Sequence, residues 1–395
     1  MNANRFQKIL LGVSLLIGLW VQSGCRSTNI LYRPAIEPGP LRVIAESEAL
    51  QWTGVALSND GRMFVNYPRW YPDRYEFAVA EVVRSKTDTN VPLPNEIVAY
   101  PDLETNSWSP EGASAALWRE RFVAVQSVHI DRQNRMWVLD TGDVSRSESR
   151  QAVVYEIDLE TDAIRRAMPV PFDVAPEGSY LNDIRVSPDG GWAFISESGL
   201  GAIIVLDVDK GTMRRVLADH PSTKGSAERI INVEGRPWVL RDSGQPLVVH
   251  CDGIAVSPDG RWVYYQAISA DRLYRAPLRS LVDDRISADW LARTVEDLGE
   301  SVVTDGMIFD DAGNLYFSAL EQDAIVYRTP DGRFETLVQG PSIRWPDSFA
   351  IDRENDLLVF TTAQIHRTPN FNADGEWPSD PFRVMSFPLF EPNDD

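Results

Sequence analysis

The sequence predicts an all-β fold, a six-bladed β-propeller whose blades are four-stranded antiparallel sheets. One phrase occurs six times: a polar residue, a short apolar run, a turn at Gly or Asn, and a second apolar run. The fourth copy shows it most clearly, because it runs from Asp252 through the turn at Gly260 into the strand WVYY that begins at Trp262. A short turn of this kind between two strand-like runs is a β-hairpin signal, so each copy is expected to form two antiparallel strands.

The six copies follow one another along the whole chain, and more strand pairs lie between them. The copies are Thr53–Gly61, Gln126–Asn134, Asn182–Gly190, Asp252–Gly260, Asp305–Gly313 and Asp347–Asn355. The clearest pairs between them are Ala202–Val208 with Met213–Leu217, and Ala324–Arg328 with Phe334–Val338. One copy and the pair after it make four antiparallel strands, which is the blade of a propeller.

The last blade is one strand short within its own stretch of sequence. It has the copy Asp347–Asn355, the run Leu357–Thr362 and the run Phe382–Phe387. An unpaired edge strand invites aggregation. We therefore expect the segment Leu41–Ala45 to supply the outer strand of this blade and close the ring.

Residues 1–25 are typical of an export signal. Arg5 and Lys8 precede an apolar stretch that is short for a membrane span. Ser23-Gly24-Cys25 then resembles the lipobox of bacterial lipoproteins, although Gln22 stands where an aliphatic residue is usual. We expect lipid attachment at Cys25 and an exported, membrane-anchored protein. The outer membrane is favoured because no Asp follows the Cys; an ordinary secretory peptide or an uncleaved anchor are the alternatives.

The rest of the chain divides into three parts: residues 26–40 are expected to form a tether, residues 41–390 the propeller and residues 391–395 an acidic tail.

The net charge of −20 argues against a nucleic-acid partner, which would need a basic face. Cys251 is the only other cysteine, so no disulfide is expected within the domain if Cys25 carries lipid. The expected partners are a small molecule and the membrane, and the sequence identifies no protein partner.

The first residue of each copy forms a polar column. Because the innermost strand of every blade lines the axis, these residues are expected at one mouth of the central channel. Converging carboxylates either raise one another's pKa or hold a cation, and an organic ammonium or a hard ion such as Ca²⁺ would suit them. The alternative is that these residues cap strand starts and bind channel water. The column is Thr53, Gln126, Asn182, Asp252, Asp305 and Asp347, with Asp183 one step along.

Roles follow from this column. Asp252 and Asp305 are the candidate catalytic proton acceptors, and with Asn182 they form the candidate set for a divalent cation, Ca²⁺ or another. The candidate ligand-binding residues are Asp347, Asn182, Asp183, Gln126, Thr53 and, from the strand end in blade six, His366.

Several motifs resemble the yellow and major royal jelly protein family, which has bacterial members. The stretch Phe64–Trp70 (FVNYPRW) is similar to the family's first-blade signature. The best match is Val125–Gly142 (VQSVHIDRQNRMWVLDTG), and the runs at Asp252 and at Leu273–Pro277 also fit. The resemblance implies a secreted six-bladed propeller with a ligand site at the channel. Some members resemble dopachrome-converting enzymes, some bind biogenic amines and others lack catalysis, so the family leaves function open. An Asn of the insect amine site has no counterpart in Thr361–His366.

A more distant resemblance is to the gluconolactonase and senescence-marker type of propeller. It implies a divalent metal held by Asp305, by Asp252 in the place of an Asn, and by a Glu position that here is Thr53, a departure from the pattern. Three hypotheses result: a yellow-type protein that binds a cationic or aromatic ligand, with or without tautomerase activity; a metal-dependent lactonase; and a non-catalytic surface propeller that binds a protein.

Overall fold

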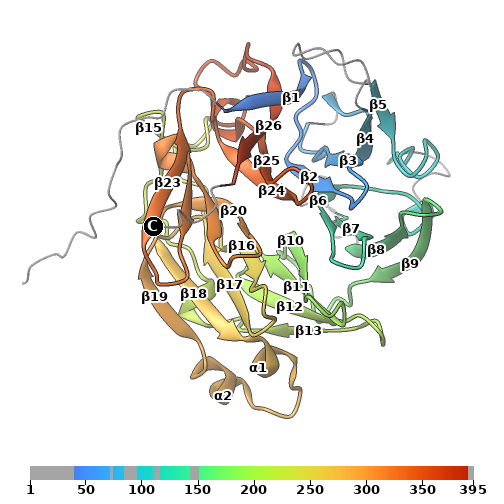
Figure 1. Cartoon of the computed structure of the whole chain (residues 1–395), viewed down its shortest axis with the longest axis vertical. Coiled ribbons are helices and arrows are strands. Elements are labelled where there is room, and N and C mark those ends of the chain that lie inside the picture. The colour runs from blue at the N-terminus through green and yellow to red at the C-terminus, as the bar shows by residue number, and fades with distance from the viewer. Residues whose placement is uncertain are drawn as a thin grey trace, which may run out of the picture. The chain divides into compact units, whose positions relative to one another are not determined.

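The computed structural model describes residues 40–71, 74–83, 96–109, 111, 116–142 and 151–389. They form six four-stranded antiparallel sheets around a central axis, which confirms the predicted six-bladed propeller (Figure 1). The signal segment with Cys25, nearly all of the tether and the acidic tail lie outside the described residues, so export and lipid attachment stay predictions. No helix among the described residues is long and apolar enough to span a bilayer.

Each blade has an inner strand, two middle strands and an outer strand. The inner strands are β2 (Gly54–Leu57), β6 (Val125–Ile130), β10 (Leu181–Val186), β16 (Cys251–Val256), β20 (Thr304–Phe309) and β24 (Pro346–Asp352). The second strands are β3 (Met63–Asn66), β7 (Arg135–Asp140), β11 (Trp192–Glu197), β17 (Trp262–Ala267), β21 (Leu315–Ala319) and β25 (Leu357–Thr362). The third strands are β4 (Val79–Val83), β8 (Val153–Asp158), β12 (Ala202–Asp207), β18 (Arg272–Pro277), β22 (Ala324–Arg328) and β26 (Phe382–Pro388). The outer strands are β5 (Glu96–Ala99), β9 (Ala163–Pro169), β13 (Thr212–Val216), β19 (Glu296–Glu300), β23 (Phe334–Gln339) and β1 (Arg42–Ser47).

The turn of the repeated phrase forms the hairpin that the sequence predicts. In the fourth copy Ser257 Oγ donates to Asp259 Oδ1 at 2.6 Å and accepts from the backbone N–H of Trp262 at 3.0 Å. Gly260 has a φ of 69°, and Asn134 takes the same left-handed conformation at 58° in the second copy. Gly and Asn adopt this region at lowest cost, which explains the turn residue in these copies; in the sixth copy the left-handed residue is Asp356, one step after Asn355.

The inner strands contact one another in sequence order, and β24 contacts β2, so the ring is closed. They lie so close that some positions leave no room for a side chain. A Cβ at Gly306 would stand 1.9 Å from the backbone oxygen of Asp347, and one at Gly253 would stand 2.6 Å from that of Asp305. The glycine after each of these two column positions is therefore required by the close approach of the next blade.

The N-terminal strand closes the ring as predicted. Strand β1 pairs antiparallel with β26, and the sheet order is β1-β26-β25-β24. Ala45 is fully buried in an apolar cluster with Trp52, Tyr67 and Phe382, whereas the neighbouring Glu46 accepts a hydrogen bond at 2.7 Å from Arg383 on the outer side. The largest apolar clusters each combine residues of two neighbouring blades, so packing between blades supplies most of the core.

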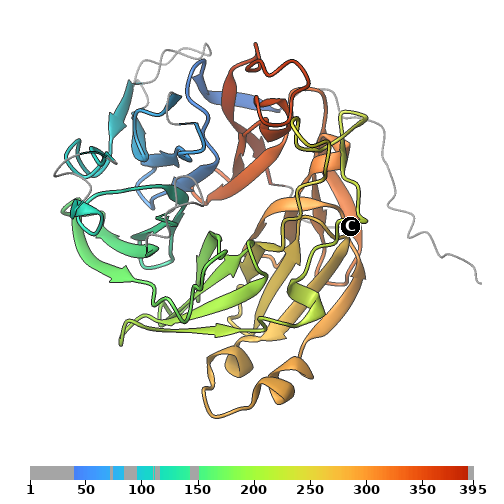
Figure 2. The ribbon, with the colours of Figure 1, turned by 180° about the vertical axis from the view of Figure 1, so that it is seen from behind.

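Two long segments outside the blades cross one end of the channel. The segment between blades three and four carries the hairpin of β14 (Asn232–Val233) and β15 (Arg236–Pro237), and Figure 2 shows it in yellow-green running towards the orange and red blades. Its Arg241 N–H donates to the oxygen of Asn370 at 2.8 Å, which ties it to the second segment, after β25. The remaining elements are the short helices α1 (Leu278–Val282) and α2 (Ala288–Ala292) and 3-10 turns at Pro221–Thr223, Leu320–Gln322 and Ile365–Arg367.

Candidate functional site

Five of the six inner strands carry a β-bulge beside their first residues. The pairing register shifts between Val125 and Ser127, Leu181 and Ile184, Cys251 and Ile254, Thr304 and Met307, and Pro346 and Phe349. A bulge bends the strand and redirects a side chain, as is common beside functional sites. The bulges leave some backbone N–H groups without a partner in the sheet, and hydroxyl groups of the second strands accept hydrogen bonds from them. In blade five, Ser318 Oγ accepts from the backbone N–H groups of Asp305 and Gly306, at 2.9 and 3.0 Å.

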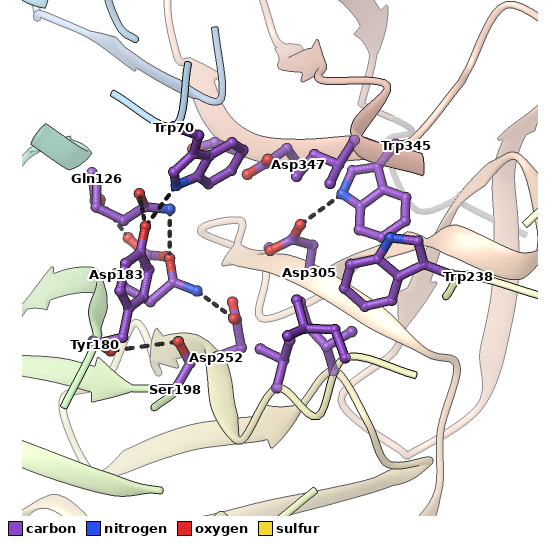
Figure 3. A pocket seen from close by; sticks show the side chains of 18 of the residues that line it. Trp70, Gln126, Tyr180, Asp183, Ser198, Trp238, Asp252, Asp305, Trp345 and Asp347 are labelled. Carbon is purple, nitrogen blue, oxygen red and sulfur yellow. Dashed lines mark hydrogen bonds between the residues drawn. The ribbon is translucent and has the colours of Figure 1, made fainter. Parts of the chain in front are cut away.

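A cavity of about 440 Å³ opens where these strands begin. In Figure 3, Asp252, Asp305 and Asp347 surround one space, with Trp70 on one side and Trp238 and Trp345 on the other. The structure therefore brings most of the polar column together, while the role of these residues in binding stays a prediction. The predicted site residues that line the cavity are Gln126, Asn182, Asp183, Asp252, Asp305 and Asp347.

A chain of hydrogen bonds runs along one wall of this cavity. Trp70 Nε1 donates to Tyr180 Oη at 2.8 Å, and Tyr180 Oη donates to Gln126 Oε1 at 2.6 Å. Gln126 Nε2 donates to Asn182 Oδ1 at 3.1 Å, and Asn182 Nδ2 donates to Asp252 Oδ2. Because every member has a defined partner, the chain holds Asn182 with its N–H group, and not its oxygen, towards the carboxyl of Asp252.

The chain ends in a pair of carboxyl groups. The carboxyl groups of Asp252 and Asp305 both line the cavity, and Trp345 Nε1 donates to Asp305 Oδ2 at 2.8 Å. Burial raises the pKa of Asp305 to about 6, against the opposing effect of the hydrogen bond from Trp345. Burial, together with the charge of Asp305, raises the pKa of Asp252 well above its usual range. Asp252 therefore keeps its proton at a pH where exposed carboxylates are ionised.

Asp347 completes the acidic group. Burial, and repulsion by Asp305 and Asp183, raise the pKa of Asp347 well above its usual range. Three neighbouring carboxyl groups thus hold protons at a pH where exposed carboxylates are ionised. A cation placed among them would release those protons and take over the negative charge.

Replacing Asp347 with Asn is expected to stabilise the protein at pH 8 by roughly 1–2 kcal/mol, the usual gain on relieving a strained site. A carboxyl whose pKa is higher in the folded state binds protons more tightly there, so its ionisation lowers stability as the pH rises. Thermal unfolding of Asp347→Asn and wild type should therefore differ at pH 8 and converge near pH 4. The exposed Asp331→Asn is the control; an equal gain there, or no gain at 347, would contradict the account.

Aromatic side chains form the opposite wall. Trp345 is fully buried, and its ring centroid lies 4.8 Å from that of Trp238 in an edge-on arrangement. Trp238 in turn lies 5.1 Å from Phe371. The backbone of Trp345 is left-handed, with a φ of 50°. Such a conformation is costly for a bulky residue and is typical of functional sites; here it accompanies the hydrogen bond from the indole to Asp305.

Two predicted ligand-binding residues do not line the cavity. Blade one has no bulge, so β2 pairs regularly with β3 and Thr53 stays buried, accepting from Asn66 Nδ2 at 3.2 Å. His366 lies behind Trp345, stacked on its ring at 5.7 Å, with Nε2 3.0 Å from Glu234. Burial lowers the pKa of His366 to about 4, so its ring is neutral. Cys251 is fully buried and burial raises the pKa of its thiol, which agrees with a packing role.

The proposed metal set of Asp305, Asp252 and Asn182 fits a divalent cation poorly. No group of three His, Cys, Asp or Glu side chains in the described part of the chain is arranged to hold a metal ion. Burial raises the pKa values of Asp252 and Asp305, and the oxygen of Asn182 accepts a hydrogen bond from Gln126. Calcium would need both carboxylates free and the amide turned.

The sequence placed Trp70, Trp345 and Tyr180 close to the polar column, but it did not reveal the part of the apolar wall that the two segments outside the blades supply. Trp238, Leu247, Val249 and Phe371 line the cavity but belong to the two segments outside the blades. Their signal was the unusual length of these connections together with their aromatic content, since long loops on a rigid scaffold commonly carry binding residues.

Comparisons with known proteins agree with this architecture. A family model described as major royal jelly protein matches residues 123–373. Protein yellow of Drosophila erecta is 25% identical over 352 residues, which cover 83% of this chain and 61% of that protein. The chain thus spans about three fifths of the length of the yellow proteins it matches.

Two further similarities concern lactonases and their structural relatives. The 6-deoxy-6-sulfogluconolactonase of Pseudomonas putida is 30% identical over 261 residues, which cover 58% of this chain and 84% of that enzyme. Regucalcin, a calcium-binding protein from Agrobacterium tumefaciens, superimposes with a TM-score of 0.51 at 16% identity, covering 89% of this chain and 96% of that chain. At that identity the likeness shows the fold alone.

Proposed function

The chain belongs to the major royal jelly protein family, and from this premise we propose that its acidic channel mouth binds a small organic cation that carries an aromatic ring. One observation carries the proposal: three carboxyl groups with raised pKa values share a cavity whose walls include Trp and Tyr side chains. Metal ions need the oxygen ligands alone, whereas an aromatic ammonium uses both features.

The size and chemistry of the cavity support an arylalkylamine. Its volume of about 440 Å³ lies in the range of small-molecule pockets. The ammonium group would pair with the ionised carboxylate of Asp305 and replace the proton held by Asp347, and the ring would pack between Trp70 and the pair Trp238 and Trp345. Charge neutralisation in a buried site and contact with aromatic faces both favour such a ligand over a neutral one.

The carboxyl pair also supports a tautomerase activity on a bound quinonoid ligand. Asp305, with a pKa of about 6, is largely ionised at neutral pH and could accept a proton from a carbon beside a carbonyl. Asp252 would give its proton to the carbonyl oxygen, so the ligand would leave as its tautomer without any oxidant. Loss of quinonoid absorbance, abolished in Asp305→Asn, would test this step.

Amine affinity is expected to fall as the pH drops through 6. The ammonium stays charged throughout this range, whereas Asp305 takes up a proton that the bound cation must displace. For one group with a pKa of 6, the dissociation constant for tryptamine should rise about tenfold from pH 7 to pH 5. Isothermal titration calorimetry measures this change. A dissociation constant that stays flat, or falls, across this range would refute the proposal.

A lactonase is the second candidate, because the sulfogluconolactonase relative covers much of the propeller. Its test is hydrolysis of sugar lactones with Ca²⁺ or Zn²⁺ added, measured by acid release. Metal-dependent turnover lost in Asp305→Ala, together with no amine binding, would favour the lactonase over the amine-binding protein.

A further inference from the structure

A second cavity lies at the other ends of the same inner strands. All six blades contribute to it, and its volume is about 110 Å³. In β6, for example, Gln126 and Ser127 line the first cavity, and His129 to Arg132 line the second. The two cavities therefore open at opposite ends of the central channel.

This second mouth is basic where the first is acidic. Arg132, Arg185, Arg353 and His129 line it, and among the described residues Asp131 is its only acidic lining residue. Asp131 is already saturated: Oδ1 accepts from two backbone N–H groups, and Oδ2 accepts from Arg135 Nε at 2.8 Å and from an indole. The negative charge of Asp131 is therefore paired with Arg135, which does not line the cavity.

The two outer arginines share a single carboxylate. Arg132 Nη2 lies 2.7 Å from Asp311 Oδ1, and Arg353 Nε lies 3.0 Å from Asp311 Oδ2. The single negative charge of Asp311 offsets only one of the two positive charges of Arg132 and Arg353, so an excess of positive charge remains at this mouth. Burial, and then the charges of Arg185 and Arg353, lower the pKa of His129 well below its usual value, so the ring adds donor capacity without charge.

The third arginine is buried. Arg185 is 6% exposed; it donates to Asp183 through Nη1 and reaches the oxygen of Met307 through Nη2 at 3.5 Å. Its Nε is buried and has no hydrogen-bond partner within the described residues. A buried donor without a partner is unfavourable, and this one belongs to a side chain that lines a basic cavity.

We propose that this second mouth binds a small oxyanion, with the chemistry of sulfate or phosphate. The guanidinium groups of Arg132 and Arg353, together with the unpartnered Nε of Arg185, supply donors from three blades, which suit the oxygens of a tetrahedral anion. A cavity of about 110 Å³ has room for an anion of that size. The site is separate from the amine cavity, because Arg132 and Arg353 do not line the latter.

Sulfate titration of the full chain tests the proposal, with thermal unfolding as readout and sodium chloride holding the ionic strength constant. Sulfate should raise the melting temperature saturably beyond chloride. Arg132→Gln and Arg353→Gln should each weaken the apparent affinity by roughly tenfold or more, the effect of one charge-assisted hydrogen bond. Both side chains are about half exposed, so these variants should fold normally.

Arg333→Gln is the matched control, because Arg333 is also an exposed arginine paired with an aspartate, at 2.8 Å, but lies away from the channel. It should bind sulfate like wild type. Crystals soaked in selenate should show anomalous density among Arg132, Arg185 and Arg353. Equal effects of sulfate and chloride, undiminished affinity in Arg353→Gln, or selenate only at other surface arginines would overturn the proposal.

Discussion

Asp305→Asn is expected to weaken the binding of tryptamine by about a hundredfold, close to 3 kcal/mol. Asp305 is the carboxyl that joins the acidic group to the aromatic wall, because it lines the cavity beside Asp252 and accepts from the indole of Trp345. Its pKa of about 6 also makes it the member that carries negative charge at neutral pH. The substitution keeps the shape of the side chain and removes that charge.

Calorimetry with the purified variant at pH 7.5 measures this loss. Asp331→Asn is the control, since it removes an exposed carboxylate of the same blade and should leave binding unchanged. Thermal unfolding distinguishes lost binding from lost structure: Asp305→Asn should be at least as stable as wild type, because a buried carboxyl with a raised pKa lowers stability when ionised. If a folded Asp305→Asn variant bound tryptamine as tightly as wild type, the acidic group would not be the amine-binding site.

Ala45→Asp is expected to destabilise the propeller by at least about 3 kcal/mol, the cost of an unpaired buried charge. Ala45 lies in the closing strand β1, fully buried against Trp52 and Phe382. Burying a carboxylate there would separate β1 from β26 and expose an edge strand. Urea unfolding measures the change.

The neighbouring residue provides the control for this prediction. Glu46 points outward and pairs with Arg383 at 2.7 Å. Exposed pairs contribute at most about 1 kcal/mol, so Glu46→Gln should change stability little. If Ala45→Asp unfolded at the same urea concentration as Glu46→Gln, β1 would not close the ring.

The repeated phrase was sufficient to predict the fold because it encodes local chemistry. Gly260 and Asn134 take left-handed turns, and the runs beside them have strand composition. The phrase also predicted the start of each inner strand to within one residue. Ring closure followed from counting strands in the last blade, since a missing strand has to come from the other end of the chain.

The site was predictable only in part, because register decides where a side chain points. Asp252, Asp305 and Asp347 reach the channel through bulges, and bulges leave no clear mark in a single sequence. Thr53 occupies the same column but lacks a bulge, so it stays in its blade. Trp238 comes from a connection whose path depends on contacts with Phe371 and therefore on tertiary structure.

The column of first residues also did not predict that the two mouths of the channel carry opposite charge. Arg185 stands two residues after Asp183 on one strand, and a strand alone does not show that such neighbours line different cavities. Their ion pair links the two ends of the channel. Only the assembled ring shows that Arg132 and Arg353, from other blades, lie with Arg185 at one mouth of the channel.

The most direct test of the acidic site compares two ligands that differ by one charge. Tryptamine and tryptophol share the indole and the two-carbon chain but end in an ammonium and a hydroxyl group, respectively. Calorimetry on the wild-type protein at pH 8 should show tryptamine binding at least about tenfold more tightly, with the preference lost in Asp305→Asn. Equal affinity for the two ligands, or no binding of tryptamine, would contradict the claim that this mouth recognises an organic cation.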